Sequence, residues 1–196
     1  MKEDVLCTFA IMKKCFTINQ FRSYEEILSY AYLFRNNMAQ GVEIFFPIEL
    51  STERQEEYAR GIKELQKYNI EVVMHLPHGP KYSLCNLGEY ERVVKDMLRS
   101  IEYSKQFGVK KFTLHLGYVN GPRQPYIDHI IPILQTLCDY ASFGEIMIEN
   151  MPGDNELGYS PDEIYNIIKQ ANRSNLKFIF DTGHANVSNF TIQAYI

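Results

Sequence analysis

The sequence has no apolar run long enough to cross a bilayer, because nothing in it approaches the roughly 20 apolar residues that a transmembrane helix needs. It also lacks the pattern of a secretory signal. The opening Met1-Lys2-Glu3-Asp4 is charged, and no uninterrupted hydrophobic segment follows it. These two absences predict a cytoplasmic protein with no membrane partner.

Cysteines are few and widely separated. The four cysteines show no CxxC spacing: Cys7, Cys15, Cys85 and Cys138. A chain of 196 residues can build a core without a disulfide framework, so we expect reduced thiols in the core or in loops. The spacing also argues against a zinc site made of thiolates, and no Ser or Cys nucleophile is paired with a neighbouring base.

Basic side chains are not concentrated anywhere in the chain. The formal net charge is −4, and Lys13-Lys14 and Lys110-Lys111 are isolated pairs. A nucleic-acid-binding protein normally carries a basic patch or stripe, so this distribution favours a small substrate over duplex DNA. The same charge distribution does not exclude a local phosphate-binding site.

Two hydrophobic periodicities alternate along the chain. We expect strands at 5–10, 42–46, 71–75, 111–115, 145–149 and 177–181, and helices at about 23–39, 51–68, 90–107, 126–141 and 160–173. Ser23 with Glu26 and Ser160 with Glu163 fit capping boxes, and Ser51 or Thr52 caps the second helix. Gly41 and Gly108 are typical of helix ends that lead into a strand.

Strands that alternate with helices predict a parallel α/β sheet. Successive strand starts from the second onward are roughly 30 to 40 residues apart, the size of βα units. No linker divides the chain, so we predict a single domain, 1–196, of the TIM-barrel type with about six of its eight βα units. A doubly wound sheet is the competing fold, but residues 9–17 contain no glycine for a phosphate-binding turn.

Four of the predicted strands end in potential metal ligands. His75 and His78 follow one strand, and the others end in His115, Glu149 and Asp181, with His184 shortly after the last. The carboxyl ends of barrel strands face a common pocket. Buried carboxylates there are costly without a partner, and a divalent cation would offset that cost. A salt bridge to Lys or Arg is the alternative for Glu149.

The two neighbouring histidines are not equivalent. Residues 75 and 78 differ by an odd number, so a continuing strand would place them on opposite faces. Pro77 breaks the strand and lets His78 turn inward on the loop. We therefore predict His78 as a metal ligand, and His75 as a substrate contact or as a group packed behind the ligands.

Four other polar residues are weaker candidates for the functional site. Glu43 is either a carboxylate behind the metal ligands or half of an ordinary ion pair. His129 lies in a predicted helix, where a surface role is favoured. Tyr82 and Tyr118 follow ligand-bearing strands, and Tyr118 is a candidate substrate contact.

Several of these segments together resemble the xylose-isomerase-like TIM barrels, a superfamily that includes sugar-phosphate isomerases and epimerases and the endonuclease IV group of AP endonucleases. The resemblance spans about residues 40–190. It is carried, in order, by Met74-His75-Leu76-Pro77-His78, Leu114-His115-Leu116-Gly117, Ile148-Glu149-Asn150 and Asp181-Thr182-Gly183-His184.

This resemblance implies roles for the ligands. In endonuclease IV-like members, residues matching His78, His115 and Glu149 hold one zinc, Glu149 bridges to a second zinc bound by Asp181, and His184 serves a third. In epimerase-like members, residues matching Glu149 and Asp181 bind one divalent metal, and the residue matching His184 contacts substrate. Both branches add a histidine from the seventh strand and a glutamate from the eighth, which this sequence does not contain.

The leading hypothesis is a metal-dependent sugar or sugar-phosphate isomerase or epimerase that uses Mn²⁺, Mg²⁺ or Zn²⁺. Glu149, or a carboxylate from the missing part of the barrel, would move a proton through an enediolate-like intermediate, with His75, His184 and Tyr118 at the substrate. The alternative is a zinc phosphodiesterase of the endonuclease IV type. A third hypothesis is an inactive, truncated barrel that self-associates, or whose open edge is covered by a complementing chain.

Overall fold

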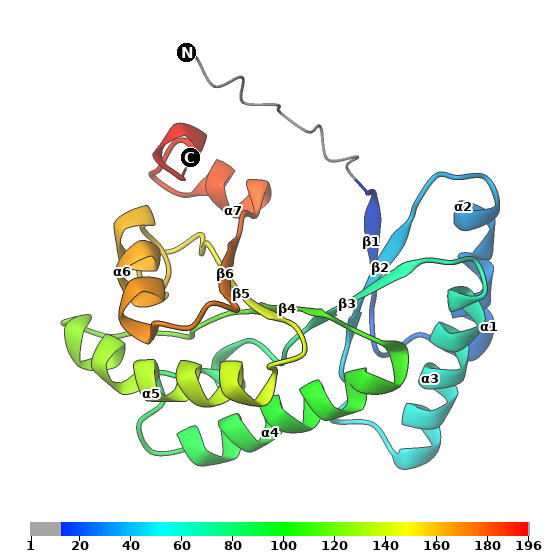
Figure 1. Ribbon diagram of the computed structural model, residues 1–196, viewed down its shortest axis with the longest axis horizontal. Helices are drawn as coiled ribbons and strands as arrows, with labels where there is room; N and C mark the ends of the chain where they lie inside the picture. The colour runs from blue at the N-terminus through cyan, green and yellow to red at the C-terminus, as the bar shows by residue number, and fades with distance from the viewer. Residues whose placement is uncertain (1–12, 196) are drawn as a thin grey trace, which may run out of the picture.

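A computed structural model describes residues 13–195, which form one six-stranded parallel sheet flanked by helices (Figure 1). The strand order follows the chain from β1 to β6. The strands are β1 (Cys15–Ile18), β2 (Gly41–Phe45), β3 (Glu71–His75), β4 (Lys111–Leu114), β5 (Glu145–Glu149) and β6 (Leu176–Ile179). In a doubly wound sheet the order of the strands across the sheet reverses at a switch point, whereas here each strand lies beside the next one in the chain. The order is that of a TIM-barrel wall, so the predicted fold class is confirmed.

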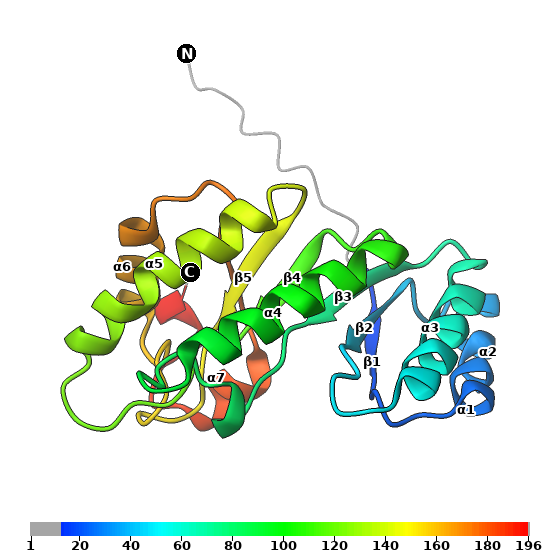
Figure 2. The same ribbon diagram turned by 90° about the horizontal axis from the view of Figure 1, so that it is seen from below.

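Helices cover the outer side of this curved sheet (Figures 1 and 2). They are α1 (Tyr24–Ser29), α2 (Ala31–Arg35), α3 (Thr52–Gln66), α4 (Tyr90–Ser104), α5 (Gln124–Tyr140) and α6 (Pro161–Ala171). A further helix, α7 (Thr182–Val187), lies beyond the carboxyl end of β6, and short 3₁₀ turns are at Pro80–Tyr82, Lys105–Phe107 and Ile192–Tyr195. No helix between residues 13 and 195 combines the length and apolarity needed to cross a membrane.

The predicted helix starts agree with the structure. Ser23 and Glu26 form a reciprocal capping box, and the hydroxyls of Ser51 and Ser160 each accept a backbone N–H in the first turn of α3 and α6. The box predicted at Ser160 is only half formed, because the Glu163 carboxylate accepts from Arg123 and from the Gly158 N–H instead. Gly108 ends its helix in the left-handed region at φ 68°. The expected helix at 23–39 is divided into α1 and α2.

The interpretation of Gly41 as a helix end is wrong. Gly41 begins β2, and a Cβ there would lie 2.6 Å from Cys15 Sγ and 2.8 Å from the Glu71 carbonyl oxygen. The positive φ after α2 belongs to Asn37, at 53°. Glycine is therefore needed at position 41 because neighbouring strands approach closely, and not because of a turn.

The first strand differs from the prediction. The strand expected at 5–10 lies outside the described residues. Cys15–Ile18, which we placed in the following connection, forms β1 and pairs with β2. Of its four residues only Ile18 is fully buried, so the segment lacks the continuous apolar run that marks the other strands.

The strand register gives the sheet two different faces. Even-numbered residues of β2 to β5 pack into the core beneath the helices, as with Ile44, Met74, Leu114 and Ile148, all 0% exposed. The paired row Phe45, His75, Thr113 and Met147 lies on the opposite face, which also carries Glu149. One step in register would exchange the faces, so the apolar core fixes where the polar side chains lie.

Candidate metal centre

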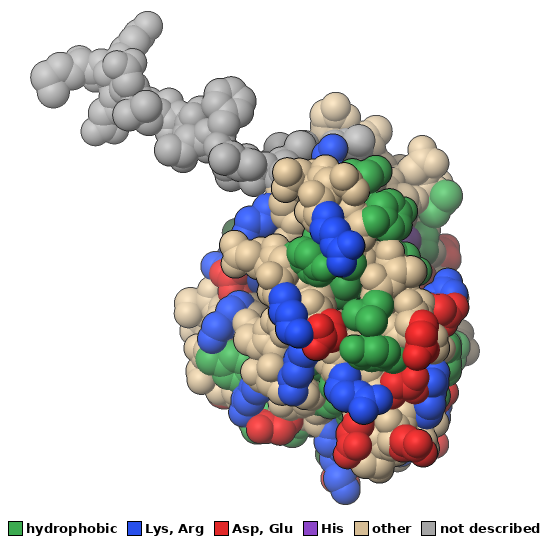
Figure 3. Space-filling view, turned by 90° about the vertical axis from the view of Figure 1, so that its right-hand side faces the viewer, with side chains coloured by type: hydrophobic (Ala, Val, Ile, Leu, Met, Phe, Trp, Pro, Cys, Tyr) green, Lys and Arg blue, Asp and Glu red, His purple; other side chains and the backbone are tan. Residues whose placement is uncertain are grey.

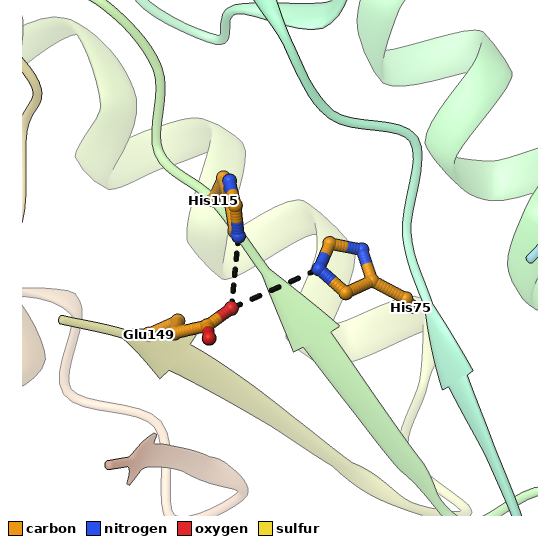
Figure 4. Close-up of side chains that lie close together, drawn as sticks. All are labelled: His75, His115 and Glu149. Carbon is orange, nitrogen blue, oxygen red and sulfur yellow. Dashed lines mark hydrogen bonds and ion pairs between the residues drawn. The ribbon is translucent and has the colours of Figure 1, made fainter. Parts of the chain in front are cut away.

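Glu149 ends β5 and is the centre of a cluster of imidazoles (Figure 4). Its side chain is buried, with the residue 7% exposed. His115, just after β4, places Nε2 2.8 Å from Glu149 Oε2, and His75, at the end of β3, places Nε2 3.7 Å from the same oxygen. Three adjacent strands therefore bring one carboxylate and two imidazoles together.

A second group meets the other oxygen of the same carboxylate. His184 in α7 places Nδ1 3.6 Å from Glu149 Oε1. Asp181 precedes α7 and caps it, since its Oδ1 accepts the His184 N–H at 2.7 Å. Ligand atoms lie within 4.8 Å of one another in each of two sets, His75–His115–Glu149 and Glu149–Asp181–His184. Glu149 is the residue that the two sets share.

The environment keeps Glu149 ionised. Burial opposes the charged form, but the hydrogen bond with His115 and the close approach of His75 outweigh it and hold the pKa of Glu149 well below its ordinary value. Burial also opposes charge on His75, yet its interaction with Glu149 prevails and raises the pKa of His75. The cluster thus has a negative centre surrounded by nitrogen ligands.

His78 lies at the exposed rim of this cluster. Its ring centroid is 4.5 Å from that of His75 and 5.2 Å from that of His115. Partial burial, followed by repulsion from those two imidazoles, lowers the pKa of His78 to about 4. His78 belongs to neither of the two sets of close ligand atoms.

The geometry therefore favours His75 over His78 as the ligand that joins His115 and Glu149. The strand register puts His75 on the same face as Glu149, and His78 lines the same pocket from the loop after Pro77. His75 Nδ1 donates to the Leu76 carbonyl at 2.8 Å, so its Nε2 is the nitrogen available toward Glu149. The metal role of His78 stays a prediction.

Glu43 points into the barrel, as one of its two interpretations required. Its carboxylate accepts hydrogen bonds from the Thr113 hydroxyl at 3.1 Å and the Thr17 hydroxyl at 3.2 Å. It lines the same pocket as Glu149. Among residues 13–195 its recorded partners are hydroxyls, so the ion-pair interpretation has no support in the described part of the chain.

The two remaining sequence candidates lie away from the cluster. Tyr118 donates its backbone N–H to Ser83 Oγ at 2.9 Å and forms a bridge with Glu156, and it does not line the pocket. Its substrate role stays a prediction. His129 is half-buried and packs edge-on against Tyr90, so its expected surface position is only partly correct.

The cluster opens into a pocket of about 360 Å³, whose lining is completed by Phe45 and Phe180. An adjoining cavity of about 330 Å³ shares Phe45, His75 and His78 and extends to Gln20 and Tyr82. Sequence reasoning missed Phe45, although its position two residues after Glu43 on β2 was a usable signal. The ring of Phe45 stacks on His75, with centroids 5.1 Å apart.

Known proteins share this architecture. A family described as xylose isomerase-like TIM barrel, with the label AP endonuclease 2, matches residues 38–194. The chain belongs to this family. The chain is also 26% identical over 130 residues to the uncharacterized protein MJ1311 of Methanocaldococcus jannaschii. The match covers 62% of this chain and 44% of that relative, so the chain spans less than half of its length.

Three solved structures show the same fold. D-psicose 3-epimerase from Clostridium cellulolyticum H10, with D-tagatose, has a TM-score of 0.75 and 14% identity, covering 93% of this chain and 68% of the epimerase. Endonuclease IV from Thermus thermophilus has a TM-score of 0.65 and 17% identity, covering 90% and 65%. A xylose isomerase-like TIM barrel protein from Mycobacterium smegmatis in complex with magnesium has a TM-score of 0.66 and 14% identity, covering 89% and 66%.

Proposed function

We propose that this protein is a metal-dependent sugar isomerase or epimerase. The observation that carries the proposal is the buried carboxylate of Glu149, with imidazoles from three other elements around it at the carboxyl ends of the strands. This is the end of a barrel where active sites are built. Family membership and structural neighbours named as sugar epimerases support the same choice.

The donor set fits a divalent cation. Because His75 Nδ1 donates to Leu76, the Nε2 lone pair of a neutral His75 faces the Glu149 carboxylate at 3.7 Å. Two electron-rich atoms in that arrangement need a proton or a cation between them. Imidazole suits Zn²⁺, and the carboxylates of Glu149 and Asp181 suit Mn²⁺ and Mg²⁺. The residues that would hold the cation are His75, His115, Glu149, Asp181 and His184.

When bound, a divalent cation would polarise neighbouring oxygens of a ketose and acidify the adjacent C–H group. We assign to the ionised carboxylate of Glu149 the role of accepting that proton and returning it. His78, at the rim of the cluster, can donate to or accept from sugar hydroxyls. Phe45 presents an apolar surface beside His78, with ring centroids 5.6 Å apart, which suits the C–H face of a sugar.

The pocket favours a small substrate over a nucleic acid. Its lining contains no Lys or Arg among the described residues. In the adjoining cavity, Lys81 is already paired with Glu49 at 2.7 Å. On the face that carries α1, α2 and α3, basic and acidic side chains are interspersed (Figure 3). A DNA-binding surface would need uncommitted cations along a strip.

The test is turnover of a panel of free and phosphorylated ketoses by metal-free protein, supplied in turn with Mn²⁺, Mg²⁺ and Zn²⁺. We expect interconversion of at least one pair of epimers or isomers, dependent on the added cation, and its loss in Glu149→Gln. The matched control is Glu156→Gln, because Glu156 is also a buried glutamate but belongs to neither ligand set. Equal turnover by wild type and Glu149→Gln would refute the proposal.

One observation favours a zinc phosphodiesterase as the second candidate. Glu149 is shared by two ligand sets, and one set contains two imidazoles, an arrangement suited to two zinc ions. Bound zinc counted per chain separates the candidates. Two or more tightly held zinc ions, together with cleavage of DNA at abasic sites, would favour the phosphodiesterase over the epimerase.

The assembly that carries the activity is a further part of the proposal. Strands β1 and β6 are the two ends of the sheet within residues 13–195. A second copy or a complementing chain is the partner that we propose for these ends, and the cytoplasm is the location that we propose. Sedimentation across a concentration range tests self-association, and a monomer at all concentrations would argue against a homodimer.

A further inference from the structure

Asn150 bonds to two members of one ligand set, Asp181 and His184. It follows Glu149 directly and is 0% exposed. Its side-chain Oδ1 accepts the backbone N–H of Asp181 at 2.7 Å, and its Nδ2 donates to the backbone carbonyl of Asp181 at 3.0 Å. Both halves of the amide are therefore used on one residue of the neighbouring segment.

These two bonds extend the sheet by one step. The pairing of β5 with β6 ends at Glu149 and Ile179, so backbone bonding no longer holds the chain when it reaches Asp181. The amide of Asn150 replaces the missing ladder bonds, because it offers a donor and an acceptor in the same way as a peptide group. Asp181 is thereby kept beside Glu149, although β6 has already ended.

The main-chain carbonyl of Asn150 contacts His184, another member of the same ligand set. Its carbonyl oxygen lies 2.9 Å from His184 Nδ1. A carbonyl can only accept, so Nδ1 carries the proton and Nε2 keeps the lone pair. Groups that accept the second N–H of a ligating histidine fix its tautomer and the direction of its ring.

We propose that Asn150 is a positioning residue for the cation site, fixing the backbone of Asp181 and the tautomer of His184. The inference rests on the proposed function, since it assigns Asn150 an effect on cation binding. It goes beyond that function because it assigns a role to Asn150, which belongs to neither ligand set. Removal of a partner of this kind costs about 10- to 100-fold in metal affinity.

The test compares Asn150→Ala with Asn175→Ala in the full chain. Asn175 is a matched control, because its amide also joins backbone segments around β6, donating to the carbonyls of Cys138, Ala141 and Gly144, but at the opposite end of the strand. Both variants should melt at lower temperature. Calorimetric titration with Mn²⁺ should show affinity reduced about 10- to 100-fold in Asn150→Ala and unchanged in Asn175→Ala.

A second readout does not depend on any cation. Asn150→Ala keeps the main-chain carbonyl but loses the amide that holds Asp181, and Asp181 in turn accepts the His184 N–H. Nitrogen-15 spectra of the metal-free imidazoles should therefore show His184 as the Nδ1–H tautomer in wild type and in Asn175→Ala, and as a mixture in Asn150→Ala, where the ring is no longer held against that carbonyl. Wild-type Mn²⁺ affinity in Asn150→Ala, or an equal loss in Asn175→Ala, would overturn the positioning role. Failure of wild type to bind any divalent cation would instead refute the proposed function, and the tautomer spectra would then decide the role of Asn150 alone.

Discussion

Replacement of Glu149 by glutamine is the perturbation with the clearest expected result. Glu149 is the residue common to both ligand sets, with one carboxylate oxygen toward His75 and His115 and the other toward His184. Glu149→Gln keeps the shape of the side chain but removes its charge. Because of the shared position, we expect one substitution to abolish cation binding by both sets.

The expected size follows from the contacts. Loss of a group behind a ligand costs about 10- to 100-fold in affinity, so loss of a charged ligand should exceed about 100-fold, or about 2.7 kcal/mol. The metal-free fold should lose much less. The carboxamide oxygen of the Glu149→Gln variant can still accept from His115, and exchanging a charged for a neutral acceptor costs about 1 kcal/mol.

The assay is equilibrium dialysis against Mn²⁺ or Zn²⁺ with elemental analysis, alongside urea unfolding of the metal-free proteins. His115→Ala and His184→Ala each remove a member of one set, so each should weaken only that set. Glu149→Gln should weaken both. Retention of one tightly bound cation per chain by Glu149→Gln would refute the central place of this carboxylate.

Three further predictions concern the rim, a tight turn and the thiols. His78→Ala should raise KM without changing cation affinity, because His78 lies outside both ligand sets; a parallel loss of cation affinity would restore it as a ligand. Gly117→Ala should destabilise by about 3 kcal/mol or more in urea unfolding, since φ is +118° and a Cβ would lie 2.2 Å from Ser83 Oγ. Gly121→Ala, at φ +92° with open space, should cost about 1–2 kcal/mol, and equal costs would contradict the packing argument. In a Cys7→Ser background, the native protein should react with a thiol reagent at Cys15 only, because Cys15 is exposed. Burial raises the pKa of Cys85 to about 12 and that of Cys138 to about 11, so both thiols should stay unreactive. Rapid labelling of Cys85 or Cys138 would contradict their buried positions.

The sheet could be predicted from sequence wherever a strand is buried on both faces. Strands β2 to β5 are short apolar runs next to capped helices, and their order follows from the repeated βα spacing. Strand β1 could not be found in this way, because Cys15–Ile18 has only one fully buried residue. Its pairing depends on contact with β2 and not on its own pattern.

The cluster was predictable as far as it depends on strand ends. His115, Glu149, Asp181 and His184 come together because parallel strands deliver their last residues to one edge. The choice between His75 and His78 depends on the sheet register and on the backbone path after Pro77, which periodicity does not contain. The role of Asn150 depends on a side chain that crosses to the next segment, so only the folded chain reveals it.

The most direct test of the account is anomalous X-ray scattering from crystals of the protein soaked in Mn²⁺. The account predicts a peak within coordination distance of a Glu149 carboxylate oxygen, with His75 and His115 or Asp181 and His184 completing the shell. Binding of Mn²⁺ only at other sites, with the Glu149 carboxylate still bonded directly to His115, would contradict it.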